Sequence, residues 1–300
     1  MTQYHHIIES VPNFSEGRNQ ETVEEIVNVF RAKEGVKLLN YSCDPDHNRM
    51  VATIVGEPAA LKAVIIESAG KAIERIDLNL HRGEHPRIGA VDVIPFIPIK
   101  GCTMEDAVSL SKEVGSELAS IYKLPVLLYE KSASAPHREN LANVRKGEFE
   151  GLDAKFLLPE WKPDYGEPIK HPTAGATAVG ARKPLIAYNV ILGTDRLDIA
   201  ESIAKRVRHS SGGLRCCKAM GVEMKQKGLV QVSMNLTDYS LTSVYQAFEM
   251  VKMEANRFGT PVMGSELIGL MPLEALVDVA AYYLGLENFS VNNVLEYKLN

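Results

Sequence analysis

Hydrophobic and polar positions repeat with two different periods along the chain, and the changes of period divide its first half into strands and helices. Short apolar runs rich in β-branched residues predict strands at residues 4–11, 36–42, 49–56, 91–99 and 125–130. Longer segments with apolar residues at helical spacing predict helices at residues 19–33, 58–77 and 105–121. The prolines within 91–99 place that strand at the edge of a sheet or at a strand end, because proline cannot donate to the ladder.

The second half repeats the order of predicted elements. Its predicted strands are residues 183–192, 216–225, 229–236 and 261–267, and its predicted helices are residues 195–208, 241–258 and 272–284. Each half therefore shows βαββαβ, the split βαβ pattern of ferredoxin-like layers. We expect an α+β fold of two such ferredoxin-like subdomains, residues 1–180 and 181–300, each a sheet with helices on one face, with a ligand channel between them.

The segment between the halves, residues 150–182, is rich in proline and glycine and contains the chain's one tryptophan, Trp161. Loops of this length in compact proteins are often functional, although they also serve as plain linkers. The glycine-rich GATAVGARK, residues 175–183, lacks the Lys–Ser/Thr pair of a phosphate-binding loop and the spacing of a dinucleotide fingerprint. Its glycines would also let the backbone approach a flat ligand closely.

Composition limits the class of protein. With 300 residues, 45% of them hydrophobic and 24% charged, the chain can bury a large core without disulfides or metal. Its net charge of -5 argues against nucleic-acid binding, although a few local cations suffice for a small anion. The N-terminus lacks the pattern of a signal peptide, and no run of about 18 apolar residues predicts a membrane span. The four cysteines form no C-x-x-C pair, so we expect free thiols in a cytoplasmic, reducing compartment.

The densest group of polar side chains is HRGEHPRIGAVDVIPFIP, residues 81–98. His81 and His85 are spaced like two metal ligands on a helix, but Gly83 and Pro86 argue against a helix there, and no third ligand follows. A loop histidine that only bonds to the backbone is the simplest alternative. An imidazole that titrates near neutral pH, set among carboxylate-binding cations, favours an active-site loop instead. The charged residues around it are Arg82, Glu84 and Arg87.

Two further polar clusters follow predicted strands. In the turn at residues 43–49, Asp and Asn suit a turn for local reasons, while His47 and Arg49 are candidates for facing an anionic ligand. In VPNFSEGRN, residues 11–19, helix capping and a tight turn explain most of the pattern. Capping and the turn do not explain Asn13 and Arg18.

Taken together, these motifs resemble the glutamate formiminotransferase family. The matching strings, in the same order along nearly the whole chain, are VPNFSEGRN, DHNR, HRGEHPRIGAVDVIPFIP, WKPDYG with GATAVGARK, and VMGSELIGLMP. The resemblance implies transfer of the formimino group of N-formimino-L-glutamate to N5 of tetrahydrofolate, giving 5-formiminotetrahydrofolate and L-glutamate in histidine degradation. It also implies a homodimer, a folate channel between two subdomains, and tetrahydrofolate as co-substrate without a metal. The cyclodeaminase to which this domain is fused in animals is not expected here.

The resemblance also implies residue roles. The second histidine of the HxGEHPR string is the family's catalytic residue, which here is His85. The tract after the tryptophan contributes to the folate site, which here means Gly166, Glu167, Pro168, Ile169, Lys170, His171, Pro172, Thr173, Ala174 and Gly175. Both substrates carry glutamate carboxylates, for which arginines are suited partners. The candidate substrate-binding residues are Asn13, Arg18, His47, Arg49, His81, Arg82, Arg87 and Arg182.

The implied reaction suits a single imidazole. Attack by N5 on the amidinium carbon of the donor requires N5 to lose a proton and the departing glutamate nitrogen to gain one. An imidazole with a pKa near neutral can do both in turn. A carboxylate near the amidinium would stabilise its charge, and Glu84, Asp44 and Asp46 are equal candidates for that role.

Three alternatives stay open at this point. The same site could use 5-formyltetrahydrofolate as a formyl donor to glutamate. The chain could instead be a non-catalytic folate-binding protein, or a metal hydrolase that uses His81 and His85. The intact loop around His85 favours an enzyme over a binding protein.

Overall fold

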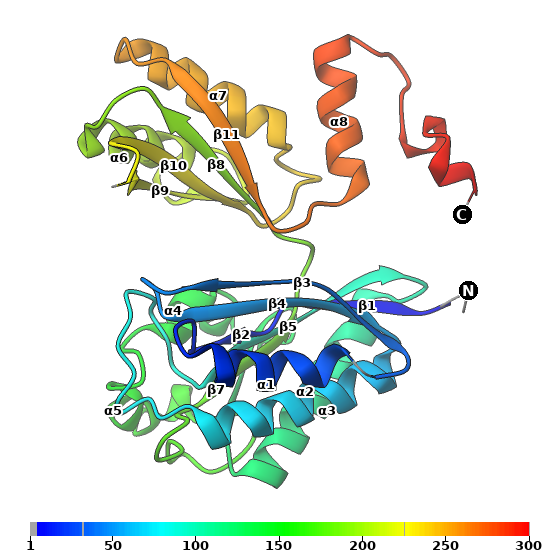
Figure 1. Ribbon diagram of the computed structural model, residues 1–300, viewed down its shortest axis with the longest axis vertical. Helices are drawn as coiled ribbons and strands as arrows, with labels where there is room; N and C mark the ends of the chain where they lie inside the picture. Colours follow the sequence, from blue (N-terminus) through cyan, green and yellow to red (C-terminus); the bar gives the residue numbers. More distant parts are fainter. Residues whose placement is uncertain (1–4, 32, 225, 300) are drawn as a thin grey trace. The chain divides into compact units, whose positions relative to one another are not determined.

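The computed structural model describes residues 5–31, 33–224 and 226–299 of the chain. Contacts divide the protein into two compact units, Met1–Arg182 and Lys183–Asn300, each with its own sheet, helices and core (Figure 1). Both units mix helices with sheets that are wholly or mostly antiparallel. The predicted α+β fold of two subdomains is therefore confirmed.

The first unit is a seven-stranded sheet with three long helices packed on one face (Figure 1). The strand order is β1-β4-β2-β5-β7-β6, with β3 paired to β4, and only the β5–β7 and β7–β6 pairs are parallel among the described pairings. The strands are β1 (Ile7–Ser10), β2 (Asn13–Phe14), β3 (Val36–Asp44), β4 (Arg49–Gly56), β5 (Val91–Lys100), β6 (Val126–Glu130) and β7 (Thr177–Ala181). The helices are α1 (Gln20–Arg31), α2 (Pro58–Arg75) and α3 (Met104–Tyr122), and two short helices follow β6, α4 (Leu141–Arg145) and α5 (Leu152–Phe156).

Helix α1 shows how the periodic pattern becomes a packed layer. Asn19 caps its first turn, because its Oδ1 accepts hydrogen bonds from the backbone N–H groups of Glu21 (3.1 Å) and Thr22 (3.3 Å). The apolar side chains that α1 buries completely against the sheet are Val23, Ile26, Val27 and Phe30, all at 0% exposure. Burial of each such side chain contributes roughly 1.5–3 kcal/mol to folding relative to leaving it exposed.

The prediction that residues 91–99 form an edge or the end of a strand is wrong. β5 lies inside the sheet, paired with β1 and β2 on one side and with β7 on the other. On the first side the pairing passes from β1 at Phe96 to β2 at Val93. Pro95 therefore lies opposite the interruption between the two short strands, where a missing ladder donor costs little.

β7 was not predicted, because its glycine-rich sequence resembles a loop. A Cβ atom on Gly180 would lie 2.3 Å from the backbone oxygen of Tyr129 in β6, and one on Gly175 would lie 2.1 Å from that of Ile88. Gly175 also has a φ of +70°, which an L side chain rarely adopts. These two glycines thus serve close packing of backbone on backbone within the unit, and neither needs a flat ligand to explain it.

We expect Gly180→Ala to destabilise the first unit by about 1–3 kcal/mol, because the added methyl must displace a paired strand. Urea unfolding followed by circular dichroism measures the change. Gly264→Ala is the matched control, since a Cβ there meets no atom within 4 Å. Equal stability of the two variants would show that β6 and β7 do not approach each other as described.

The second unit is a four-stranded antiparallel sheet in the order β11-β8-β10-β9, with α6 and α7 packed against it (Figure 1). Its strands are β8 (Ile186–Leu192), β9 (Cys217–Met224), β10 (Leu229–Leu236) and β11 (Val262–Ile268). Its helices are α6 (Leu197–Val207), α7 (Val244–Arg257) and α8 (Leu273–Leu284). Ser243 and Gln246 form a capping box at the start of α7. None of the helices in the described part of the chain has both the length and the hydrophobicity of a membrane span.

Candidate active site

The loop of residues 77–90 joins α2 to β5 and carries both histidines of the HRGEHPR string. Backbone hydrogen bonds tie both of its ends to residues 173–176, just before β7. Its middle is tied to the β3–β4 turn, where the N–H of Glu84 donates to the oxygen of Asp46 at 3.3 Å. A loop fastened at three places holds its side chains in a defined arrangement.

Two glycines permit this close fit. A Cβ atom on Gly83 would lie 2.2 Å from the backbone oxygen of His47, and one on Gly89 would lie 2.0 Å from that of Ala176. Any larger residue would push the loop away from the β3–β4 turn or from the residues just before β7. The glycines of the string are therefore explained by packing of the loop that carries His85.

His85 lies between a cation and a carboxylate, with 12% of its side chain exposed. Its Nδ1 is 3.4 Å from Nη1 of Arg49, the first residue of β4. Its Nε2 is shielded from solvent, has no hydrogen-bond partner within the described residues, and lies 3.8 Å from Oδ2 of Asp92 in β5. The ring is thus largely buried, with one nitrogen facing each charged group.

This environment keeps the imidazole neutral. Burial is the largest cause that lowers the pKa of His85 below its ordinary 6.5; Asp92 raises it, and Arg49 and Arg145 lower it again. The net direction is downward, so the ring carries no charge for most of the time at pH 7. A neutral imidazole is the form that accepts a proton from a substrate.

Asp92 is a buried carboxylate that stays ionised. Its side chain is 1% exposed, Oδ1 accepts from the N–H of Ile88 (2.7 Å), and Oδ2 accepts from Nε (2.9 Å) and Nη2 (2.5 Å) of Arg145 at the end of α4. Burial alone would raise the pKa of Asp92, but Arg145, His85 and the Ile88 N–H outweigh it and hold the pKa below its usual value. Asp92, which sequence reasoning did not single out, is therefore the carboxylate that faces the Nε2 of His85.

Arg49 is the cation best placed to meet an anionic ligand near His85. Burial, and then the charge of Arg145, lower its pKa, yet a guanidinium stays charged at any ordinary pH. Within the described residues no carboxylate oxygen lies within 4.0 Å of its guanidinium nitrogens, and the side chain makes its hydrogen bond to His85. A half-buried arginine with no carboxylate partner among the described residues suits recognition of a substrate carboxylate.

His81 has a different environment from His85. It is 7% exposed, its Nε2 donates to the backbone oxygen of Asn48 at 2.9 Å, and its Nδ1 accepts from Nε of Arg87 at 3.3 Å. Both ring nitrogens are therefore engaged by the protein itself. Burial, the largest cause, lowers the pKa of His81, so the ring stays neutral and supports the loop.

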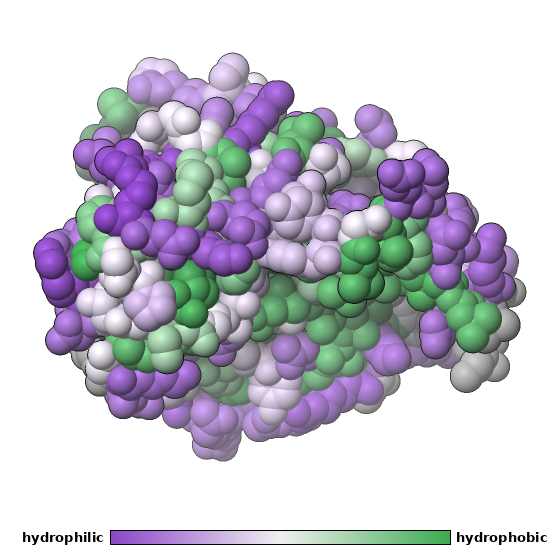
Figure 2. Space-filling model, turned by 90° about the horizontal axis from the view of Figure 1, so that it is seen from above, coloured by the Kyte–Doolittle hydropathy of each residue, from purple (hydrophilic) through white to green (hydrophobic). Residues whose placement is uncertain are grey.

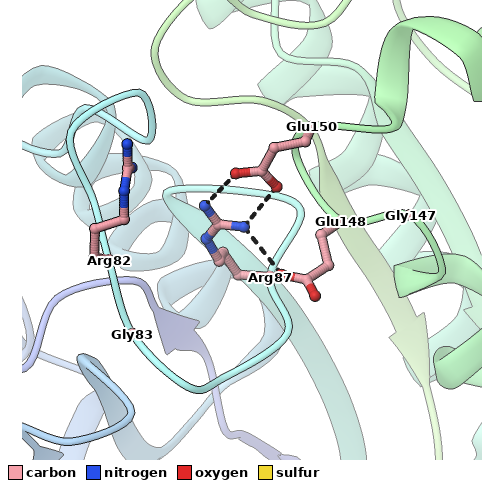
Figure 3. A pocket seen from close by; sticks show the side chains of 6 residues that line it. All are labelled: Arg82, Gly83, Arg87, Gly147, Glu148 and Glu150. Atoms are coloured by element: carbon pink, nitrogen blue, oxygen red, sulfur yellow. Dashed lines mark hydrogen bonds and ion pairs between the residues drawn. The ribbon is translucent and has the colours of Figure 1, made fainter.

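Arg87 is neutralised from within the chain. Its Nη1 and Nη2 bind Glu148 (3.0 Å) and Glu150 (2.7 Å) beyond α4, as Figure 3 shows. This pairing holds the pKa of Glu150 down at about 2. Arg82 stands apart from the cluster in Figure 3, exposed, and the described part of the chain places no carboxylate within 4.0 Å of it. An open cavity of about 390 Å³ is lined by Arg82, Gly83, Arg87, Gly147, Glu148 and Glu150.

The β3–β4 turn brings two other candidates to the same edge of the sheet. His47 is exposed, its ring centre is 6.5 Å from that of His85, and its Nδ1 lies 2.6 Å from Oδ2 of Asp44. Arg18 is also exposed and donates through Nε to the backbone oxygen of Pro45 at 2.7 Å. The amide nitrogen of Asn13 donates to the oxygen of Val11 at 2.9 Å, within the strand interruption beside β5.

Arg182 is not part of this group. Its backbone N–H donates to Phe96 at 3.0 Å, toward the end of β5 that is remote from Asp92, and its side chain contacts Tyr129. Burial, the largest cause, raises the pKa of Tyr129 to about 12. The structure thus brings Arg49, His47 and Arg18 to the edge near His85 and leaves Arg182 away from it.

The tract of residues 166–175 divides into two parts. Residues 166–169 are exposed, with the side chain of Ile169 at 70% exposure. The rest forms a turn closed by backbone hydrogen bonds between His171 and Gly175 (2.8 and 3.0 Å), with His171 Nδ1 accepting from the N–H of Ala174 at 3.0 Å. Lys170 pairs with Asp153 at 2.8 Å. This turn lies directly against the loop that carries His85.

The described residues contain no group of three or more histidine, cysteine or acidic side chains arranged to hold a metal ion. In addition, the Nε2 of His81 is occupied by the Asn48 oxygen. The arrangement around His85 thus offers proton transfer and anion binding.

Two residues of the site were missed by sequence reasoning. Asp92 had a signal, since it is the one charged residue before the terminal Lys100 of β5, and an unpaired charge is rarely buried. Arg145 had none, because it meets Asp92 across 53 positions of sequence, from a five-residue helix with no periodic pattern.

Comparison with known proteins gives consistent matches along both units. Residues 7–182 match the family model described as the formiminotransferase domain, N-terminal subdomain, and residues 187–298 match that of the formiminotransferase domain. A glutamate formimidoyltransferase of Streptococcus pyogenes serotype M1 is 49% identical over 98% of both chains, and one of Thermoplasma acidophilum is 44% identical over 98% of this chain and 97% of its own. The formimidoyltransferase-cyclodeaminase of Mus musculus is 40% identical over 95% of this chain, which spans 54% of that protein.

Proposed function

The chain belongs to the formiminotransferase family, and from this premise we propose that it transfers the formimino group of N-formimino-L-glutamate to N5 of tetrahydrofolate. The products are 5-formiminotetrahydrofolate and L-glutamate. The observation that carries the proposal at the level of the site is the largely buried, neutral imidazole of His85, set beside an arginine that has no carboxylate partner in the described part of the chain.

His85 is the proton shuttle of this reaction. N5 attacks the carbon of the donor's amidinium group and gives a tetrahedral intermediate, while the proton of N5 passes to the imidazole. The imidazolium then gives that proton to the departing glutamate nitrogen, and the C–N bond breaks. Proton transfer of this kind is worth roughly 10²–10⁴-fold, and alignment of the two substrates contributes up to about 7–11 kcal/mol more.

Arginines hold the carboxylates that both substrates carry. Arg49 is placed for a carboxylate near the reacting groups, while Arg82 and Arg18 reach the surface of the same region. Arg87 and His81 act indirectly, since each is already engaged by protein groups that fix the loop. Asn13, His47 and Arg182 remain candidates for contacts with more distant parts of the substrates.

Tetrahydrofolate is bound with the help of residues 166–175. This part of the proposal is supported by the backbone hydrogen bonds between residues 173–176 and the loop that carries His85. The exposed residues 166–169 leave an apolar side chain, Ile169, free to contact a flat ring.

The enzyme acts in the cytoplasm as a homodimer. The first point is supported by the four cysteines, all of them free thiols, which persist in reducing compartments. The second is supported by apolar surface on the second unit, where α8 buries only Ala275 and Val277. Figure 2 shows hydrophobic surface (green) exposed among polar residues on the face that it draws. Large exposed apolar areas often mark protein interfaces.

The decisive experiment is a spectrophotometric assay of the purified protein with N-formimino-L-glutamate and tetrahydrofolate. Production of 5-formiminotetrahydrofolate is the expected result. A parallel reaction with 5-formyltetrahydrofolate and glutamate is the control. Formyl transfer without formimino transfer, or no transfer in either reaction, would contradict the proposal.

A further inference from the structure

Burial of the ion pair between Asp92 and Arg145 needs an explanation beyond stability. Both side chains lie in the first unit's interior, at 1% and 16% exposure, and the carboxylate uses both oxygens in hydrogen bonds to Arg145 and Ile88. A buried ion pair often contributes no more stability than well-packed apolar residues of the same volume. A pair kept at such a place is therefore a candidate for a role at the neighbouring His85.

The two ring nitrogens of His85 are chemically distinguished by their neighbours. Arg49 can only donate hydrogen bonds, so the Nδ1 that faces it at 3.4 Å must carry a lone pair. The hydrogen of the neutral ring then belongs to Nε2, which is shielded from solvent and faces Oδ2 of Asp92 at 3.8 Å. The contacts on both sides favour the same tautomer.

Arg145 lies on α4, a helix of only five residues that a buried lysine side chain holds in place. Lys155 is 8% exposed, and its Nζ donates to the backbone oxygens of Asn143 (2.9 Å), Val144 (2.5 Å) and Lys146 (3.1 Å) at the C-terminal end of α4. The same ammonium group lies 4.0 Å from the ring centre of Trp161. A cation at a helix C-terminus binds carbonyls that would otherwise lack partners, so α4 presents Arg145 in a fixed position.

We propose that the Arg145–Asp92 pair is the positioning element of His85: it fixes the ring as the Nε2–H tautomer and leaves Nδ1 as the atom that exchanges protons with the substrates. Arg145 and Asp92 are positioning residues, because they act through His85. The inference rests on the proposed function only in so far as it concerns substrates. The tautomer itself is a property of the free protein.

Asp92 also balances the charge when His85 takes up a proton. The charged and titratable groups that face the ring are Arg49 from β4, His47 from the β3–β4 turn, Asp92 from β5 and Arg145 from α4. Without the Asp92 carboxylate, the imidazolium would form beside two guanidinium groups with no anion to offset them. Proton uptake would then require a lower pH, because a cation is disfavoured near like charges.

The first test needs no substitution in the pair. In protein labelled with ¹⁵N-histidine, long-range proton–nitrogen correlation spectra distinguish the two neutral tautomers, and the spectrum of His85→Ala identifies the signal of His85 among the 8 histidines. The expected result is a hydrogen on Nε2 at neutral pH. A hydrogen on Nδ1 would overturn the proposal whatever reaction the enzyme catalyses.

The second test is Asp92→Asn, with Asp195→Asn as the control at an exposed position. General acid–base catalysis as a whole is worth roughly 10²–10⁴-fold, so losing the orientation of the base should lower kcat by about tenfold to a hundredfold with KM little changed. The acid limb of the kcat/KM profile should move to lower pH, as should the titration of the His85 nitrogen signals. An unchanged pH profile and tautomer would overturn the proposal. If Asp92→Asn fails to fold, the tautomer of the unaltered protein decides.

These experiments test the catalytic role of His85 and the positioning role of the Arg145–Asp92 pair separately. A His85→Ala variant that keeps its turnover would refute the catalytic assignment, while the nitrogen spectra would still report whether Asp92 sets the tautomer. An Nδ1–H ring in an active enzyme that depends on His85 would refute only the positioning role.

Discussion

Replacement of His85 by alanine is expected to lower kcat by roughly 10²–10⁴-fold, because the reaction then loses the group that accepts and returns a proton. Binding of tetrahydrofolate should change little, since the imidazole acts on the reacting nitrogen and not on the bulk of the pterin. Steady-state kinetics measure the first effect. Calorimetric titration with a folate measures the second.

His209→Ala is the matched control, because this histidine is exposed and lies in the second unit. It makes the same chemical change and should keep the activity of the unaltered protein. Turnover by His85→Ala within about tenfold of that level would be too small a loss for a general acid–base residue and would refute the shuttle. Loss of folate binding along with turnover would instead indicate a role in assembling the site.

Arg138→Met should lower the free energy of unfolding by about 3–5 kcal/mol, because it leaves a buried carboxylate without its cation. Arg138 is 5% exposed and binds Asp164 at 2.6 Å. It also donates to the backbone oxygens of Glu160 and Lys162, both at 2.7 Å. These bonds fasten the segment before the 166–175 tract against β6. Urea unfolding followed by circular dichroism measures the loss.

The exposed pair of Arg196 and Asp198, with a similar separation of 2.7 Å, supplies the control. Arg196→Met should leave the unfolding midpoint almost unchanged, because water and salt screen a pair on the surface. Equal effects of the two variants would mean that Asp164 finds another partner or becomes accessible to water.

Much of the fold could be predicted because its signals are local. The apolar periodicity of α1 and the alternation of β10 each reflect one buried face, and a single sequence displays both. The central position of β5 could not be predicted. A proline excludes a ladder donor wherever it occurs, but only the pairing shows that Pro95 lies opposite an interruption between two strands.

The active-site loop could be predicted from one short sequence motif, but the partners of its side chains elsewhere in the chain could not. The string identified the loop of His85, since histidine beside several charges is unusual in one short segment. It could not tell Arg87, which two glutamates neutralise, from Arg49, which lacks a carboxylate partner within the described residues. That difference depends on residues about 60 positions away, at 148 and 150. The spacing of residues in the sequence does not show which distant residues pair in the fold.

Trp161 is the chain's one tryptophan, and it lies in contact with Lys155 and with His137, whose ring centre is 4.6 Å away. Selective excitation of indole emission will therefore report on the first unit alone, from a fluorophore that touches the lysine cap of α4. Loss of the contact between Lys155 and the C-terminal end of α4 should alter the emission before the sheet of the first unit unfolds. The second unit will be silent in the same measurement, so a single fluorescence transition is no proof that the whole molecule unfolds in one step.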